Sequence, residues 1–237
     1  MPAYERPLSR HRTLNSKAKG ISLNRREFAT RLAAASAMLP LVDFARAQGG
    51  TPTEGAEYVK LSPPVAVTPP PGKVEVVEFF TYACPHCFEF EPTLEAWRKQ
   101  PSPDVYFHRV PVPFLFNYEY FQPIYYTLEA MGLVEAMQLK VFNAVHLEHQ
   151  RLDKPEDIAA FMKKNGIDPV KFMSIFNSFS VRVKVQQVKH LIEMYQIDQV
   201  PMLAVQGRFI TSPGHAKGGA QALQVVDYLT QRIKSGR

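Results

Sequence analysis

The chain has 237 residues, of which 46% are hydrophobic and 21% charged, a composition typical of a globular protein with one good apolar core or two small ones. Its formal net charge of +6 lies entirely in residues 1–47, because residues 48–237 carry equal numbers of basic and acidic side chains. A neutral body lacks the electrostatic footprint of a nucleic-acid-binding protein, and it contains no apolar run of about 18 residues that would predict a membrane-spanning helix.

Residues 1–47 have the pattern of an export signal. The pair Arg25-Arg26 precedes a short, mildly apolar stretch at 32–44, and Ala45-Arg46-Ala47 is a small-x-small cleavage site that puts the mature start at Gln48. A weakly apolar stretch after two arginines is typical of the twin-arginine export route. The alternatives are a general secretory signal with an incidental arginine pair, and an amphipathic segment that is not cleaved.

The first elements of the body are a linker, a strand and a helix. Residues 48–73 are rich in Gly, Pro and Thr and are predicted to be a linker or an edge arm. The β-branched and aromatic run Val74–Phe80 predicts a buried strand. Cys84 follows after a short turn, and Pro85 suits the first position of a helix that extends to about Lys99.

The rest of the body is mostly helical. Val105–Val110 is a second predicted strand, and the apolar spacing from about 117 to 197 predicts a block of helices. The helical segments are 119–131, 133–149, 155–165, 169–179 and 181–195. Met202–Val205 and Arg208–Ile210 are predicted to pair as antiparallel strands, and a last helix is expected near 220–234.

The order of these elements indicates an α/β protein with an insertion. Removal of the helical block leaves a compact α/β unit, so the block is interpreted as an inserted domain. The predicted divisions are the export signal (1–47), the linker or N-terminal arm (48–73), the first α/β part (74–116), the helical domain (117–197) and the second α/β part (198–237).

The only two cysteines lie in one motif, Cys84-Pro85-His86-Cys87. A Cys-x-x-Cys at a helix N-terminus places the first thiol beside unpaired backbone N–H groups and the positive end of the helix dipole, which favour its thiolate form. His86 can add a donor or a positive charge. We therefore expect Cys84, with an exposed sulfur, to exchange with a partner's cysteine, and Cys87 to resolve the mixed disulfide. The pair is predicted to be a redox-active disulfide.

Other uses of the motif fit less well. A structural zinc site needs four ligands, and the chain has no second cysteine pair. Covalent haem attachment needs a histidine after the second cysteine, where this sequence has Phe88. A structural disulfide at this spacing is unusual and stays as an alternative. No metal and no cofactor are expected.

The segment Glu78–Cys87 resembles the active-site segment of the DsbA family, in the thioredoxin superfamily. Phe176–Phe179 and Val200–Phe209 resemble the corresponding later parts, and the resemblance covers roughly residues 58–235 with matched order and spacing. It implies a thioredoxin-like fold with an inserted all-α domain. It also implies a periplasmic protein dithiol oxidase.

This resemblance implies partners as well. The substrates would be reduced, unfolded exported proteins, and a DsbB-type membrane oxidase linked to quinone would restore the disulfide. No nucleic acid is expected, and nothing in the sequence argues against a monomer. Two alternatives stay open: a disulfide isomerase or reductase on the same fold, and a peptide-binding chaperone with incidental cysteines.

The resemblance also assigns roles to residues outside the motif. Pro201 would be a cis-proline facing the active site, with the backbone of Val200 free to pair with a substrate strand beside Cys84; the alternative is an ordinary trans proline. Glu78 would be a buried acid that relays the proton of Cys87, with a pKa raised by burial, or else a strand residue facing water. The predicted catalytic residues are Cys84, Cys87, His86 and Glu78, and the predicted substrate contacts are Pro85, Val200 and Pro201.

Overall fold

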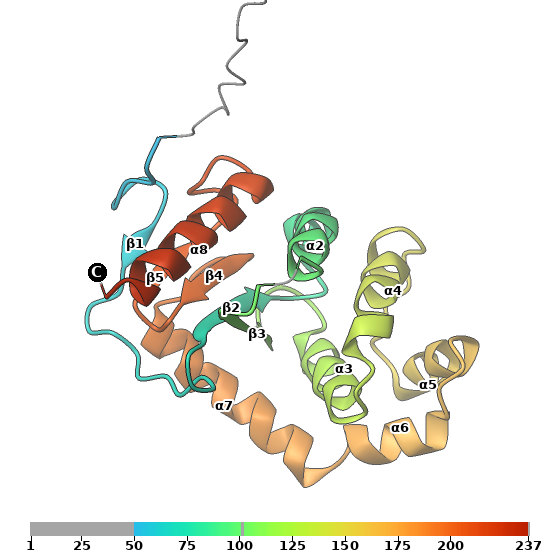
Figure 1. Cartoon of the computed structure of the whole chain (residues 1–237). Coiled ribbons are helices and arrows are strands. Elements are labelled where there is room, and N and C mark those ends of the chain that lie inside the picture. Colours follow the sequence, from blue (N-terminus) through green and yellow to red (C-terminus); the bar gives the residue numbers. More distant parts are fainter. Residues whose placement is uncertain (1–49, 101, 237) are drawn as a thin grey trace, which may run out of the picture. The chain divides into compact units, whose positions relative to one another are not determined.

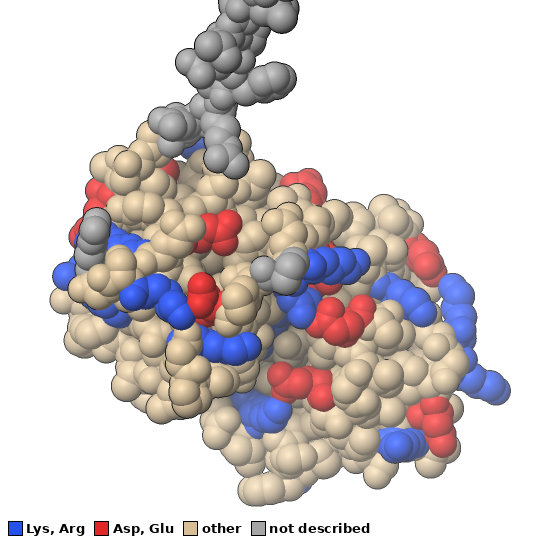
Figure 2. Space-filling view, viewed as in Figure 1, with Lys and Arg blue, Asp and Glu red and all other residues tan. Residues whose placement is uncertain are grey.

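The structure is a computed structural model that describes residues 50–100 and 102–236. The predicted export signal, with its arginine pair and cleavage point, lies outside the described residues. Within those ranges, no helix has the length and apolar character needed to cross a membrane. On the face shown in Figure 2, basic and acidic side chains are interspersed, as the balanced charge of the body predicts.

A five-stranded mixed sheet lies at the centre of the described body (Figure 1), in the order β1-β5-β4-β2-β3. The central strand β2 (Val74–Phe80) pairs in parallel with β3 (Val105–Pro111) and antiparallel with β4 (Met202–Val205). Strand β4 pairs with β5 (Phe209–Thr211), and β5 with β1 (Val59–Lys60), both antiparallel. The parallel pair brings the carboxyl ends of β2 and β3 to the same edge of the sheet.

Helices α2 (Pro85–Arg98) and α8 (Gly219–Lys234) cover one face of this sheet (Figure 1). Their buried side chains, such as Leu94 and Val226, form an apolar cluster with Val76 of β2. Because successive side chains of a strand point to opposite faces, Val76 of β2 joins this cluster, whereas Val77 and Phe79 join the core on the other face.

Five helices follow one another between β3 and β4. They are α3 (Tyr118–Ala130), α4 (Val134–His146), α5 (Pro155–Lys164), α6 (Pro169–Phe176) and α7 (Phe179–Tyr195). Their apolar side chains share one continuous core with the second face of the sheet, where the ring of Phe79 contacts Tyr195 and that of Phe80 contacts Tyr125. The helical block is therefore packed against the α/β part, and its predicted limits at 117 and 197 stay a prediction.

The α/β class predicted from the sequence is confirmed. Element boundaries differ from the prediction by up to three residues, and two local differences have a clear cause. Part of the segment left as a linker or an edge arm forms strand β1, which is fixed by the burial of Tyr58 and Leu61 on either side of it. Two residues are too few for a period-two pattern to be visible in the sequence. Helix α7 begins earlier than predicted, because the side chain of Ser178 caps it by accepting a hydrogen bond from the N–H of Val181.

Candidate active site

The two cysteines lie where strand β2 passes into helix α2. Strand β2 ends at Phe80, and the turn that follows is closed by the N–H of Cys84, which donates to the carbonyl oxygen of Thr81 at 3.1 Å. Cys84 is the N-cap of α2 in an extended conformation, and Pro85 takes the first helical position, where its missing N–H leaves no hydrogen bond unmade. The local sequence therefore starts the helix at Cys84 and sets its thiol at the positive end of the helix dipole.

Cys84 and Cys87 are free thiols in opposite electrostatic environments. A hydrogen bond from the Cys87 thiol is the largest of the effects that lower the pKa of Cys84 to about 6, and the N–H groups of Cys87 and His86 add to it against the opposing effect of burial. Burial raises the pKa of Cys87 well above its usual value, and the neighbouring Cys84 raises it further. At neutral pH this arrangement favours a thiolate at Cys84 and a protonated thiol at Cys87.

Cys84 is less exposed than the sequence predicts. Cys84 is only 5% exposed, whereas an exposed sulfur was predicted. The reason is a segment distant in sequence: the sulfur of Cys84 lies 3.6 Å from the carbonyl oxygen of Val200, to which it donates a hydrogen bond in its thiol form. A partner thiol must therefore approach Cys84 from a restricted direction.

His86 projects into solvent beside the dithiol. Its side chain is 77% exposed, and Nδ1 lies 3.0 Å from Oε2 of Glu89, one turn along the same helix. This hydrogen bond raises the pKa of His86, and the negative charges of Glu89 and Cys84 act in the same direction. A protonated His86 in turn helps to lower the pKa of Cys84.

The Val200–Pro201 peptide bond is cis, as predicted, and faces the dithiol. Pro201 is buried, and Val200 is partly exposed. Both residues line a cavity of about 420 Å³, together with His86, Phe90 and the loop at 212–214. The cavity therefore places a concave surface next to the motif, bounded by α2 on one side and by the segment before β4 on the other.

Behind the dithiol, a buried arginine joins three acidic side chains. The Nε of Arg109 donates to Glu78 at 2.7 Å, and its Nη2 donates to Glu91 at 2.9 Å and to Glu95 at 2.8 Å. Arg109 stands directly opposite Glu78 in the parallel register of β2 and β3. Arg109, Glu78 and Glu91 are buried, whereas Glu95 is partly exposed.

The positive charge of Arg109 does not fully compensate for the loss of hydration of the buried carboxylates. Burial raises the pKa of Glu78 despite the charge and hydrogen bond of Arg109. Burial also raises the pKa of Glu91, to about 8, and the negative charge of Glu78 adds to this shift. For Glu95 burial acts in the same direction, but hydrogen bonds and charges from Arg109 and Arg98 outweigh it and lower the pKa. The cluster therefore holds at least one exchangeable proton near neutral pH.

Comparison with known proteins identifies the family. The family described as DSBA-like thioredoxin domain matches residues 104–229, more than half of the chain. The chain belongs to the DsbA family. It is 39% identical over 191 residues to the thiol:disulfide interchange protein DsbA of Burkholderia cepacia, a match that covers 81% of this chain and 90% of that protein. It is 40% identical over 204 residues to DsbA of Pseudomonas aeruginosa, covering 86% of this chain and 96% of that protein.

Solved structures of DsbA proteins share the fold. The crystal structure of Pseudomonas aeruginosa DsbA matches with a TM-score of 0.73 and 40% identity, over 78% of this chain and 95% of that one. The structure of DsbA from Xylella fastidiosa matches with a TM-score of 0.72 and 28% identity, over 78% of this chain and all of that one. The predicted DsbA resemblance and thioredoxin-like fold are confirmed.

Three members of the charged cluster in this DsbA-family chain are not identified from the sequence. The residue pattern places Arg109 only in a strand, and Glu91 and Glu95 only in a helix. A signal was present, since a charged residue in an apolar strand needs a buried partner, and Glu91 lies four residues after Cys87, on the same face of α2. The pairing of Arg109 with Glu78 depends on the register of β2 and β3, which cannot be determined from the sequence alone.

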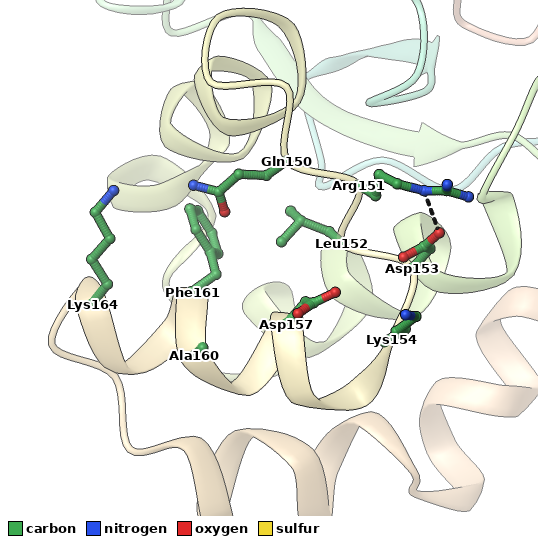
Figure 3. Close-up of a pocket in the computed structure, with 9 residues that line it drawn as sticks. All are labelled: Gln150, Arg151, Leu152, Asp153, Lys154, Asp157, Ala160, Phe161 and Lys164. Carbon is green, nitrogen blue, oxygen red and sulfur yellow. Dashed lines mark ion pairs between the residues drawn. The ribbon is translucent and has the colours of Figure 1, made fainter.

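A second cavity, of about 580 Å³, lies away from these residues, between the loop at 150–154 and helix α5 (Figure 3). The side chains of Leu152 and Phe161 face each other across it, and Arg151 forms an ion pair with Asp153 at its rim. It shares no lining residue with the cavity beside the dithiol. Within residues 50–100 and 102–236, no group of three or more His, Cys, Asp or Glu side chains is placed to hold a metal ion.

The raised pKa of Glu91 should make stability depend on pH. The folded protein keeps this proton up to about pH 8, whereas the unfolded chain releases it near 4.5, so the free energy of unfolding falls as pH rises through that window. Glu91→Gln keeps an oxygen acceptor for Arg109 but cannot ionise. We expect its stability relative to the parent to rise between about pH 4.5 and about pH 8, by up to about 5 kcal/mol, because each pKa unit is worth about 1.4 kcal/mol.

Urea unfolding of both proteins in the disulfide form measures this difference, because the thiols then do not titrate. Glu193→Gln, at an exposed position of helix α7 with no ion pair among the described residues, is the matched control and should follow the parent. Parallel pH profiles for Glu91→Gln and the parent would contradict the assignment.

Proposed function

We propose that this DsbA-family protein is a thiol–disulfide oxidoreductase that introduces disulfides into exported proteins through Cys84 and Cys87. The observation that carries the proposal is the difference between the two thiols: the pKa of Cys84 is lowered to about 6, and that of Cys87 is raised. A dithiol whose first sulfur is stable as a thiolate is easily left in the reduced state, and its disulfide is therefore a strong oxidant.

The reaction consists of two thiol–disulfide exchanges. A substrate thiolate attacks the sulfur of Cys84 in the Cys84–Cys87 disulfide, and that bond breaks with its electron pair leaving on Cys87, which takes up a proton. A second substrate thiolate then attacks the substrate sulfur of the mixed disulfide and releases Cys84 as a thiolate. The low pKa of Cys84 makes it a good leaving group in this step. The substrate gains a disulfide, and the protein keeps both electrons.

Glu78 is assigned to proton transfer with Cys87. Its carboxyl is buried with a raised pKa, and its charge is among the influences that raise the pKa of Cys87. A protonated Glu78 can supply the proton that Cys87 needs when it leaves as a thiolate, and it can take that proton back when Cys87 attacks during reoxidation. Arg109 holds the carboxyl in place from the neighbouring strand.

The remaining site residues have binding and tuning roles. His86 stabilises the Cys84 thiolate through its charge and backbone N–H, and Pro85 starts the helix on which both cysteines depend. Val200 and Pro201 form the wall against which a substrate strand would lie, with the cavity of about 420 Å³ next to them to accept its side chains. These assignments rest on the position of each group relative to Cys84.

The proposed location is the periplasm, with export directed by residues 1–47 and cleavage after Ala47. Support comes from the signal pattern of the sequence and from membership of the DsbA family. Fractionation of cells that express the full chain, with N-terminal sequencing of the periplasmic form, should give a start at Gln48. Replacement of Arg25-Arg26 by two lysines should block export, and undiminished export of that variant would exclude the twin-arginine route.

The proposed partners follow from the chemistry. Reduced, unfolded exported proteins supply the attacking thiolates, and a DsbB-type membrane oxidase linked to quinone would take the two electrons and restore the disulfide. Disulfide isomerase or reductase activity on the same fold, and peptide binding with incidental cysteines, are the alternatives that the following experiment separates.

Purified mature protein should be found mostly reduced at equilibrium with millimolar glutathione, because a stabilised Cys84 thiolate favours the reduced form, and its disulfide form should introduce disulfides into reduced, denatured ribonuclease A. Cys84→Ser should abolish this activity, because the attacked sulfur is gone, and Cys87→Ser should accumulate mixed disulfides visible on non-reducing gels. A dithiol that stays oxidised at the same glutathione ratio would favour a reductase, and rearrangement of scrambled ribonuclease without net oxidation would favour an isomerase. Undiminished protection of substrates by the double serine variant would favour a chaperone.

Loss of the Glu78 carboxyl should slow the proton transfer step. We expect Glu78→Gln to oxidise ribonuclease about tenfold more slowly, less than the roughly hundredfold effect of a fully rate-limiting acid–base group, because water replaces it in part. The rate should also lose part of its pH dependence. Glu95→Gln is the matched control, since it binds the same arginine at a more exposed position. Equal rates and pH profiles for the two variants would remove Glu78 from the mechanism.

A further inference from the structure

One face of helix α4 contacts the turn that carries the dithiol. Gln138, Phe142 and His146 are spaced four residues apart, so that they form a row along one side of the helix. All three contact Tyr82, which lies in the turn between β2 and α2. The row connects the helical block to the active site, and none of its residues has a role in the mechanism described above.

The contacts in this row are specific. Oε1 of Gln138 accepts a hydrogen bond from the buried hydroxyl of Tyr82 at 2.7 Å, and the ring of Phe142 packs edge-on against the ring of Tyr82. Nε2 of His146 lies 2.8 Å from the carbonyl oxygen of Tyr82 and, since that oxygen can only accept, Nε2 is the donor. The imidazole of His146 also stacks on Phe88, with 5.0 Å between the ring centroids and 8° between the planes.

The bond from His146 orients one peptide unit of the turn. In the four-residue turn Thr81–Cys84, the peptide between Tyr82 and Ala83 is the central one, and its reversal interconverts the two common turn types. Here its carbonyl accepts from His146, and its N–H, on Ala83, donates to the hydroxyl of Thr81 at 3.3 Å. Both polar groups of this peptide are therefore hydrogen-bonded, and the donor to its carbonyl comes from helix α4.

We propose that His146 is a positioning residue for the reactive thiol: by fixing the Tyr82–Ala83 peptide and the ring of Phe88, it sets the direction in which Cys84 leaves the turn. The proposal rests on the function proposed for Cys84. It makes the helical block a part of the redox centre, because a residue on α4 determines how the thiolate meets the helix N-terminus.

The direction of the Cys84 side chain matters because the hydrogen bonds that stabilise its thiolate are short in range. They come from the Cys87 thiol and from the N–H groups of Cys87 and His86 on α2, with the His86 charge in addition. Glu78 acts on the neighbouring Cys87 from β2. None of these groups is altered when His146 is replaced, so a change in the titration of Cys84 would report its orientation.

Two substitutions separate the hydrogen bond from the ring. His146→Phe keeps a ring to stack on Phe88 but has no donor for the Tyr82 carbonyl, whereas His146→Gln keeps a donor at the same distance along the side chain and loses the ring. His190→Phe makes the same exchange at an exposed position of α7 and is the matched control.

The rate of Cys84 alkylation, measured against pH, gives the pKa of the thiol in each variant. We expect His146→Phe to raise this pKa by about one unit, so that below about pH 6 the thiolate fraction and the alkylation rate fall about tenfold. His146→Gln should recover most of the loss, and His190→Phe should match the parent. The equilibrium with glutathione should shift toward the oxidised form by the same factor in His146→Phe.

A pKa in His146→Phe equal to that of the parent overturns the proposal, and so does a shift that His146→Gln fails to rescue. If His146→Phe does not fold, Thr81→Val tests the same peptide from its other end, because it removes the acceptor of the Ala83 N–H. An unchanged pKa of Cys84 in Thr81→Val would also overturn the proposal. Failure of the proposed function is distinguishable, because the parent itself would then show no low pKa and no oxidation of substrate.

Discussion

The site depends on one buried guanidinium. Arg109 on β3 binds Glu78 on β2 and Glu91 on α2, so a single side chain ties together the two strands and the helix that support Cys87. Burial of isolated charges is costly, and the hydrogen bonds between these groups offset that cost only in part. One guanidinium cannot neutralise both buried carboxyl groups, so the pKa values of Glu78 and Glu91 are raised. A proton therefore stays on the cluster near neutral pH, beside the thiol of Cys87, which must gain and lose a proton during the reaction.

The two thiols differ because their surroundings act in opposite directions. Cys84 meets hydrogen-bond donors, a helix N-terminus and the charge of His86, all of which favour its anion. Cys87, three residues on, is enclosed in the apolar core, and the negative charge of Glu78 adds to the effect of burial. Neither cysteine has an unusual covalent setting. The difference in reactivity has two sources. One is the position of the pair at the start of helix α2, and the other is the apolar core and the charged groups of β2 and β3 that surround Cys87.

Much of this could be predicted from the sequence because it is encoded locally. The β-branched run, the proline at the first position of a helix and the spacing of apolar residues fix the elements and the motif, and Glu78 was recognisable as a charge in an apolar strand. The partners Arg109 and Glu91 were not, since their contact depends on strand register and on how α2 packs. The low exposure of Cys84 has the same origin: its cover, Val200, comes 116 residues later in the chain.

The fold contains no cysteine beyond the reactive pair, and that has a consequence for biogenesis. A disulfide between Cys84 and Cys87 closes a very short loop, so it restricts the unfolded chain little and adds little to stability through chain entropy. The protein can therefore mature by packing alone, without prior oxidation by another catalyst. Folding that does not require the disulfide suits a catalyst whose cysteine pair alternates between the oxidised and the reduced state.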